Sequence, residues 1–258
     1  MSFFKKSLGQ NFLTDKNIAN KIIKLIDNYQ KKNIIEIGPG KGALTEIIYK
    51  KKPKKIILIE KDKMLFKELE SKYVNNKLFE IYNEDALKFN YKKINKPKSI
   101  IANLPYNISI KLIIIWLKNI TDFNEIIVMI QKEVAQKMNY KNIDKMNRLN
   151  ILTAMTSNFK IEFNVSNNVF FPKPKVLSSV VRITPKKKIE YNFFKLENFT
   201  KILFRNKRKK IQNVLPEEML KILKMKSDIS NINNILNSRA EDLTLKKITY
   251  LFKEFLQI

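Results

Sequence analysis

Cysteine and histidine are both absent from this chain of 258 residues. Their absence excludes a disulfide framework, a cysteine nucleophile, a Ser-His-Asp triad, an imidazole general base and zinc clusters. Any chemistry must therefore use carboxylates, amides, hydroxyls, amines, backbone groups or a cofactor.

Long hydrophobic runs are also missing. The longest, around Leu112–Leu117 and Ile126–Ile130, are too short to span a bilayer. Met1–Leu13 lacks the apolar region of a signal peptide. We therefore expect a cytoplasmic protein with no membrane partner. With 44% hydrophobic residues, the chain can bury a sizeable core in one large domain, or in one domain with a smaller second.

Acidic residues are few: 24 Asp and Glu stand against 51 Lys and Arg, and the formal net charge is +27. This excess favours a polyanionic partner, because lysine and arginine release counterions when they bind phosphates. The chain also contains 46 Lys, 38 Ile and 30 Asn but only 5 Arg, as strongly AT-biased coding would produce. Charge alone therefore leaves a nucleic-acid partner and a solvated lysine coat both open.

Glycine is scarce and concentrated. The chain has four glycines, where the usual share of ~7% would give about 18. Three of them lie in the segment Gly38-Pro39-Gly40-Lys41-Gly42. Residues 33–37 before it are typical of a buried strand, and residues 43–50 after it have helical spacing. Because glycine permits a positive φ and a close approach to a ligand, this order predicts a nucleotide site.

Strand and helix patterns continue to alternate beyond the glycine segment. Further strands are expected at 55–59, 78–82, 99–102 and 125–130, and helices at 63–72, 108–118 and 131–139. This alternation predicts an α/β fold with a Rossmann-like, mostly parallel sheet that binds ligands at the carboxyl ends of its strands. Glu60, Asp85 and Asn103 follow such ends. Each alone is also explained as a turn or a helix cap, but with the glycine segment they predict one site.

Four acidic residues gather at this sheet edge: Glu36, Glu60, Glu84 and Asp85. S-adenosylmethionine is a sulfonium cation, and a locally acidic pocket suits it. Glu60 stands 20 residues after Gly40, where an acid can accept hydrogen bonds from both ribose hydroxyls. A nicotinamide enzyme would usually need an acid–base residue beside its substrate, and the usual one, histidine, is absent. The sequence therefore predicts S-adenosylmethionine as the cofactor.

The segment Asn103-Leu104-Pro105-Tyr106 indicates the methyl acceptor. An exocyclic amine on a base is a poor nucleophile, because its lone pair is delocalised into the ring. The Asn103 side-chain carbonyl and a neighbouring backbone carbonyl can accept its two N–H bonds. Pro105 biases Leu104 toward an extended conformation that presents its carbonyl, and Tyr106 can stack on the base. A proline turn after a strand is the alternative interpretation.

Five segments together resemble the rRNA adenine N6-dimethyltransferases. They are Gln10–Leu13, Glu36–Gly40, Asn103–Ser109, Gln131–Ala135 and Phe170–Val176. The last has the family's FxPxPKV pattern, and the match continues nearly to the end of the chain. NLPYNIS, QKEVA and FxPxPKV resemble the small-subunit branch, which dimethylates two adjacent adenines near the 3′ end of 16S-type rRNA. The antibiotic-resistance branch, which acts on large-subunit rRNA, typically has NIPY instead.

The resemblance also implies roles for single residues. The S-adenosylmethionine site would be lined by Asn11, Leu13, Gly38, Glu60, Asp85 and Asn103. Gly9 and Gln10 would close over this pocket. Asn103, Leu104, Pro105 and Tyr106 would hold the target adenine. Phe170 would stack on the other face of the flipped base, and filling the core is its alternative.

We expect residues 1–185 to form a class I methyltransferase domain, closed by an antiparallel hairpin of strands at 161–165 and 179–183. Residues 186–258 are expected to form a small all-helical domain. A cluster there would dock rRNA phosphates, with a solvated helix face as the alternative: Arg205, Lys207, Arg208, Lys209 and Lys210. Asn147 stands where the family usually has glycine, a change that could alter a helix start.

The favoured function is S-adenosylmethionine-dependent dimethylation of small-subunit rRNA, with the immature small ribosomal subunit as partner. We expect a monomer that uses no metal. Two alternatives remain: a large-subunit rRNA adenine N6-methyltransferase, and a non-catalytic rRNA-binding assembly factor. The intact NLPY segment and the acidic ribose site argue against the second.

Overall fold

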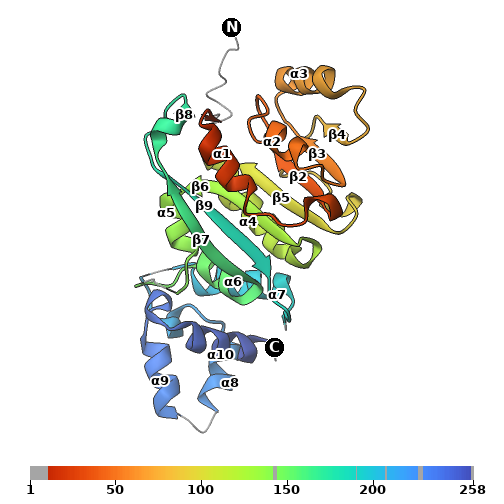
Figure 1. The fold of residues 1–258 in the computed structure, drawn as a ribbon. Helices are drawn as coiled ribbons and strands as arrows, with labels where there is room; N and C mark the ends of the chain where they lie inside the picture. Colours follow the sequence, from red (N-terminus) through yellow and green to blue (C-terminus); the bar gives the residue numbers. More distant parts are fainter. Residues whose placement is uncertain (1–10, 142–143, 190, 207, 226–228, 257–258) are drawn as a thin grey trace. The chain divides into compact units, whose positions relative to one another are not determined.

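The computed structural model describes residues 11–141, 144–189, 191–206, 208–225 and 229–256. The chain divides into two compact units (Figure 1). The first contains the chain up to Ala135 together with Ser157–Pro185, and the second contains Gln136–Thr156 and the chain from Lys186 onward.

The first unit is built on a seven-stranded sheet. Its spatial order is β4 (Phe79–Tyr82), β3 (Lys55–Ile59), β2 (Asn33–Ile37), β5 (Lys98–Asn103), β6 (Glu125–Gln131), β9 (Ser178–Pro185) and β7 (Ser157–Val165). The strands from β4 to β6 are parallel to one another, and β9 is antiparallel to both β6 and β7. The expected Rossmann-like α/β sheet is confirmed, as is the antiparallel hairpin at its end.

The direction in which the chain adds successive strands to the sheet reverses at β2. From β2 the chain runs through β3 to the edge strand β4, and then returns to β5 on the other side of β2. Ile48 of α2 (Thr45–Lys50) and Leu69 of α3 (Lys63–Tyr73) belong to one apolar cluster with Ile34 of β2, and α4 (Tyr106–Lys118) follows β5. α5 (Lys132–Met138) follows β6. The carboxyl ends of β2 and β5 therefore border the crevice in which such sheets bind ligands.

The central strands are covered on both faces. All five residues of β2 are buried, and Ile34 and Ile35, which are adjacent within this strand, are both 0% exposed. Successive side chains of a strand point to opposite faces, so the burial of two adjacent residues shows that both faces of β2 are covered, as in a parallel sheet with helices on both sides. On the face of Ile34, Ile22 of α1 (Lys16–Ile23) and Ile48 of α2 belong to the same apolar cluster.

A separate two-stranded ribbon joins two segments that are far apart in the sequence of the first unit. It pairs β1 (Phe12–Leu13) with β8 (Phe170–Phe171) in antiparallel fashion. Thr14 reinforces the pairing, because both its backbone N–H and its hydroxyl donate to the Val169 carbonyl, each at 2.9 Å. The ribbon thus fastens the chain after residue 10 to the segment that precedes β9.

The second unit is helical. Its helices are α6 (Arg148–Thr156), α7 (Phe193–Leu203), α8 (Glu217–Lys224), α9 (Ile229–Asn237) and α10 (Leu245–Phe255). Phe199 of α7 contacts Phe252 and Phe255 of α10, with ring centroids 5.3 and 5.4 Å apart. The sequence division placed residues 136–156 in the first domain, whereas the structure groups them with this unit. Arg148 of α6 donates to Glu197 of α7 at 2.6 Å.

Asn147 caps the start of α6. Its side-chain oxygen accepts a hydrogen bond from the Asn150 backbone N–H, and its own backbone N–H donates to the Asn150 side chain, both at 3.0 Å. Its amide nitrogen donates to the Lys137 carbonyl at 3.0 Å. A glycine would keep the backbone N–H bond but has no side chain to make the other two, so the departure from the family pattern supplies a helix cap.

A buried carboxylate joins three strands at the amino-terminal side of the sheet. Glu125 begins β6, and its side chain is only 4% exposed. One oxygen accepts from Lys32, just before β2, at 2.7 Å, and the other accepts from Arg182 of β9 at 2.5 Å. Removing one member of a buried, paired group leaves the others uncompensated.

Replacing Glu125 with Gln should lower the free energy of unfolding by between about 1 and 3 kcal/mol, below the loss for a wholly buried pair because Lys32 and Arg182 are partly solvated. Urea unfolding followed by circular dichroism measures the change. Glu46→Gln, which breaks the exposed Glu46–Lys72 pair, is the control and should cost less than about 0.5 kcal/mol. Equal losses in the two variants would show that Glu125 contributes no more than a surface pair.

Candidate active site

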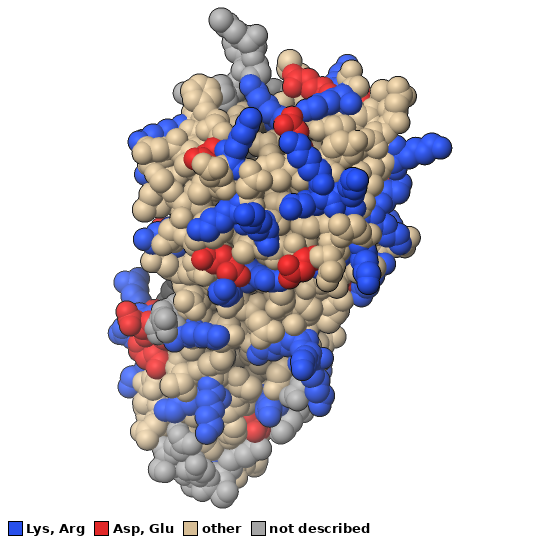
Figure 2. Space-filling view, viewed as in Figure 1, with Lys and Arg blue, Asp and Glu red and all other residues tan. Residues whose placement is uncertain are grey.

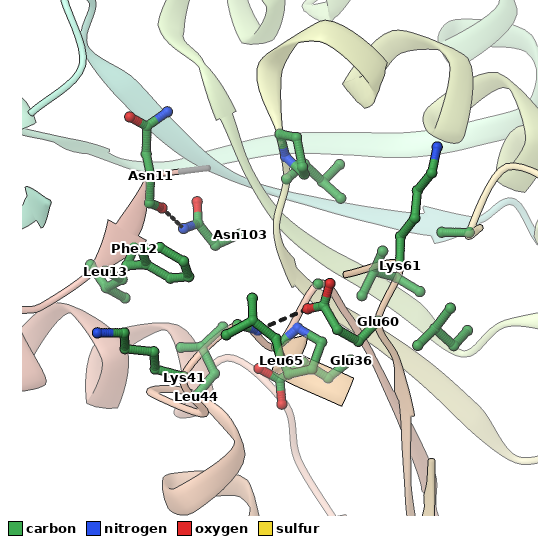
Figure 3. A pocket seen from close by; sticks show the side chains of 18 of the residues that line it. Asn11, Phe12, Leu13, Glu36, Lys41, Leu44, Glu60, Lys61, Leu65 and Asn103 are labelled. Atoms are coloured by element: carbon green, nitrogen blue, oxygen red, sulfur yellow. Dashed lines mark hydrogen bonds between the residues drawn. The ribbon is translucent and has the colours of Figure 1, made fainter. Parts of the chain in front are cut away.

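A cavity of about 250 Å³ opens at the carboxyl ends of β2, β3 and β5 (Figure 3). Its walls come from β1, the glycine segment, the residues after β3 and β4, and the end of β5. All six residues assigned to the cofactor from sequence lie in its lining: Asn11, Leu13, Gly38, Glu60, Asp85 and Asn103. Gly9 and Gln10 lie outside the described residues.

The glycine segment needs its glycines for two different reasons. Gly38 has φ +60°, and a Cβ built on it would meet nothing within 4 Å, so its backbone lies open to the cavity. Gly40 has φ +57°, and a Cβ there would lie 2.7 Å from the Phe12 ring. Residues 40–44 form a turn, which is why the helix expected from residue 43 begins at Thr45. The sequence assigned no role to Phe12, which lies over this turn.

Glu60 is held in place by two backbone groups. One carboxylate oxygen accepts from the Asp62 N–H at 2.8 Å and the other from the Gly40 N–H at 3.2 Å. Burial raises the pKa of Glu60, and these two hydrogen bonds oppose that shift. Each carboxylate oxygen has a further lone pair, so the group can still accept hydrogen bonds from two ligand hydroxyls.

Asp85 already has two donors. Its Oδ1 accepts from the Leu87 N–H and its Oδ2 from the Lys61 ammonium, both at 2.9 Å. Burial alone would raise the pKa of Asp85, but the hydrogen bonds from Lys61 and Leu87 and the charge of Lys61 outweigh it, so the pKa lies below its usual value. Nothing in the sequence indicated this ion pair. The Lys61 side chain is 59% exposed, so a ligand amine can displace it at little cost.

Glu36 differs from the other acids because it is buried at the end of β2. It is 2% exposed and accepts from the Thr45 hydroxyl at 2.6 Å. Burial raises the pKa of Glu36 to about 8; the charge of Glu60 adds to this shift and the Thr45 hydrogen bond opposes it. Glu84, the fourth acid, pairs with Lys93 at 3.1 Å. The pocket is therefore less negative at neutral pH than a count of four acids suggests.

The Asn103 amide has a fixed orientation (Figure 3). Its nitrogen donates to the Asn11 backbone carbonyl at 2.7 Å, which leaves the oxygen Oδ1 as the group that can accept from a ligand. The next residue, Leu104, is anchored because its backbone N–H donates to Met129 of β6 at 3.1 Å. Asn103, Leu104 and Pro105 all line the cavity.

Two residues expected at the target base do not line the cavity. Tyr106 begins α4 and is half-buried, with its hydroxyl 2.7 Å from the Ser178 hydroxyl. Phe170 is 4% exposed and packs in the apolar core with Leu13. This is the core-filling alternative for Phe170, and this geometry does not support its expected stacking role. Its neighbour Phe171 is 60% exposed.

The expected RNA-docking cations lie in the turn between α7 and a short 3-10 helix, Ile211–Asn213. Arg205, Arg208, Lys209 and Lys210 are all exposed, and Lys207 lies outside the described residues. Lys210 donates to the Asn237 side chain at 3.2 Å. Lysine and arginine are also spread widely over the visible face of the protein, where acidic residues are few (Figure 2).

Two further observations concern other kinds of partner. Within the described ranges, no group of three or more acidic side chains could hold a metal ion. In the same residues, no helix is long and apolar enough to cross a membrane.

Comparison with known proteins identifies relatives over most of the chain. The family model described as "Ribosomal RNA adenine dimethylase" matches residues 1–253. "Ribosomal RNA small subunit methyltransferase A" of Malacoplasma penetrans is 42% identical over 217 residues, covering 83% of this chain and 78% of that protein. The protein of that name from Wolbachia sp. subsp. Drosophila simulans is 36% identical over 258 residues, covering 96% and 92%.

Solved structures give the same architecture. A dimethyladenosine transferase from Plasmodium falciparum superposes with a TM-score of 0.78 at 26% identity, covering 95% of this chain and 97% of that one. The 23S rRNA methyltransferase ErmE superposes with a TM-score of 0.70 at 21% identity, covering 96% and 100%. At 21% identity, the similarity to ErmE supports a shared fold and no statement about function.

Glu36 should make the stability of the protein depend on pH. Unfolding returns the pKa of Glu36 to about 4.5 from about 8, so between these values the folded state holds one proton more than the unfolded state. The free energy of unfolding then falls as pH rises, by up to about 1.4 kcal/mol per pH unit from this group. Glu36→Gln should remove that part of the slope, measured by urea unfolding between pH 5 and 8.

Glu46→Gln on α2 is the matched control for this measurement. The hydrogen bond and charge of Lys72 lower the pKa of Glu46, so its titration affects stability only below about pH 5. The control should therefore keep the wild-type slope between pH 5 and 8. A Glu36→Gln slope equal to that of the wild type would mean that Glu36 is ionised in the folded protein.

Proposed function

The chain belongs to the ribosomal RNA adenine dimethylase family, and on that premise we propose that it dimethylates N6 of two adjacent adenines near the 3′ end of small-subunit rRNA. The methyl donor is S-adenosylmethionine. The immature small ribosomal subunit is the substrate, and the enzyme acts as a monomer in the cytoplasm. The orientation of the Asn103 amide is the observation that carries this proposal.

The cavity suits the cofactor. The backbone at Gly38 is open to a ligand, Glu60 presents acceptors suited to ribose hydroxyls, and Asp85 is an ionised acceptor suited to an adenine amine. Asn11 and Leu13 of the N-terminal segment complete the lining. S-adenosylmethionine supplies an electrophilic methyl group on a positively charged sulfur.

Asn103 prepares the target amine for attack. Because its nitrogen is engaged by Asn11, in the first of the two transfers its oxygen accepts one N–H bond of the adenine amine, and the Leu104 backbone carbonyl accepts the other. These two bonds draw the nitrogen lone pair out of conjugation and aim it at the methyl group. The proton is lost after transfer, when the nitrogen is cationic and acidic, so no histidine or other general base is required.

The small subunit is favoured over the large one by two observations. The relatives named above act, by name, on the small-subunit rRNA, and the chain has NLPY at positions 103–106. A non-catalytic assembly factor would need neither an oriented Asn103 amide nor backbone-anchored Glu60. Both are present, so we favour an active enzyme.

Methylation of purified subunits tests the proposed function. The protein should transfer labelled methyl groups to unmethylated small subunits, and mass spectrometry should map them to adjacent adenines near the 3′ end of the rRNA. Asn103→Ala should lower the rate at least about 100-fold, as loss of a transition-state hydrogen bond does, while still binding S-adenosylmethionine measurably. Asn17→Ala, at an exposed position of α1, is the control and should match the wild type.

Each other outcome has a distinct meaning. Label in the large subunit would identify the protein as a large-subunit rRNA adenine N6-methyltransferase. No label in either subunit would favour the non-catalytic assembly factor. Unchanged turnover by Asn103→Ala would refute the role of that amide.

The exposed cations after α7 should contribute to rRNA affinity. Changing Arg205, Arg208 and Lys209 together to Gln should weaken binding to small-subunit rRNA and reduce the slope of log affinity against log salt by about 2 to 3, because a protein that neutralises fewer phosphates releases fewer counterions. Filter binding at several salt concentrations measures this. Lys50, Lys51 and Lys67 changed together to Gln remove the same charge from the first unit. Equal slopes in both triple variants would identify the cluster as part of a general lysine coat.

A further inference from the structure

An exposed aromatic side chain lies on the ribbon whose other strand lines the cavity. In the ribbon of β1 and β8, Phe171 pairs with Phe12 and Phe170 pairs with Leu13. Residues directly opposite each other in an antiparallel pair present their side chains on the same face. Phe170 and Leu13 share the buried face, at 4% and 6% exposure. Phe171 therefore lies on the face of Phe12, which lines the cavity.

The loop that carries Phe171 combines this ring with positive charge. Phe171 is 60% exposed, and Lys173 and Lys175 after it are both exposed. Residues 166–178 contain no Asp or Glu. Exposed apolar groups alone would suit a protein partner, but cations without acids beside an aromatic ring match single-stranded nucleic acid, which offers phosphates and bases with π faces.

The ring is presented by a loop that is fastened on both sides. Before it, Val169 accepts from the Thr14 backbone and hydroxyl. After it, the Asn167 side-chain nitrogen donates to the Pro174 carbonyl at 3.2 Å, across the loop. A ring held on such a support loses little conformational freedom when a base stacks on it.

We propose that Phe171 stacks on the unpaired base next to the adenine in the pocket, while Lys173 and Lys175 bind the phosphates of that strand. This inference rests on the proposed function and specifies how the RNA strand reaches the site. Because the two target adenines are adjacent, the base on Phe171 while one is methylated is an immediate neighbour of that adenine. The ring thereby sets the position of the strand relative to Asn103.

Kinetics with unmethylated small subunits test this role. Phe171→Ala should lower kcat/KM about 10-fold or more, the effect typical of losing one base–aromatic stack, and Phe171→Trp should retain activity. Phe171→Leu keeps an apolar side chain without a π face and should behave like the Ala variant. Phe194→Ala removes a ring that is 67% exposed on α7, and this control should match the wild type. Thermal unfolding and S-adenosylmethionine affinity should be unchanged in all four variants.

A fluorescent base gives a direct readout of stacking. A short single-stranded RNA with 2-aminopurine beside the target adenine should be quenched on binding the wild type and Phe171→Trp, but much less by Phe171→Leu. Lys173→Gln combined with Lys175→Gln should reduce the salt slope of binding to this single strand by about 1.4.

The outcomes separate this inference from the proposed function. A wild-type enzyme that does not methylate small subunits refutes the function itself. A second outcome is that the wild type methylates small subunits normally while Phe171→Leu and Phe194→Ala give the same kinetics and the same quenching. That result overturns the stacking role and leaves the proposed function intact. A loss of S-adenosylmethionine affinity in Phe171→Leu would also overturn it, since Phe171 would then act through Phe12 on the cofactor pocket.

Discussion

The hydrogen bond between the Asn103 amide nitrogen and the Asn11 carbonyl is the constraint on which the site depends. An amide has a donor end and an acceptor end, and only the acceptor end can hold the N–H bonds of an adenine amine. The 2.7 Å bond occupies the donor end. It requires β1 to be in place, and β1 is held by its pairing with β8. A catalytic group at the end of β5 therefore depends on two segments that are distant in sequence.

The second constraint is electrostatic. A protein with a net charge of +27 must still bind a cationic cofactor, and it does so with acids in different protonation states. Burial keeps Glu36 protonated at neutral pH, whereas Lys61 and the Leu87 backbone N–H keep Asp85 ionised. The pocket thus carries less negative charge than its four acids suggest, while Asp85 stays available as an ionised acceptor.

The sequence predicted the sheet and the strand ends that meet in the cavity, because apolar periodicity and glycine placement are local signals. It could not predict the state of Glu36 or the Lys61–Asp85 pair, since both depend on which side chains the fold brings together. The burial of the Phe170 ring was likewise beyond it. In a strand of two residues, one step of register decides which ring is buried, and only the pairing with β1 sets that register. Residues 136–156 join the helical unit through tertiary contacts such as Arg148–Glu197.

Four of the five arginines relate composition to structure. In a chain with 46 lysines, an arginine supplies a planar, permanently charged guanidinium where a lysine would supply a compact ammonium. Arg182 and Arg148 each hold a carboxylate from another element, Glu125 and Glu197. Arg205 and Arg208 are exposed in the turn after α7. Two arginines therefore stabilise the fold and two face solvent where phosphates can reach them. Most of the lysine excess can be coding drift without weakening the case for an RNA substrate, because that case rests on a few placed groups and not on the total charge.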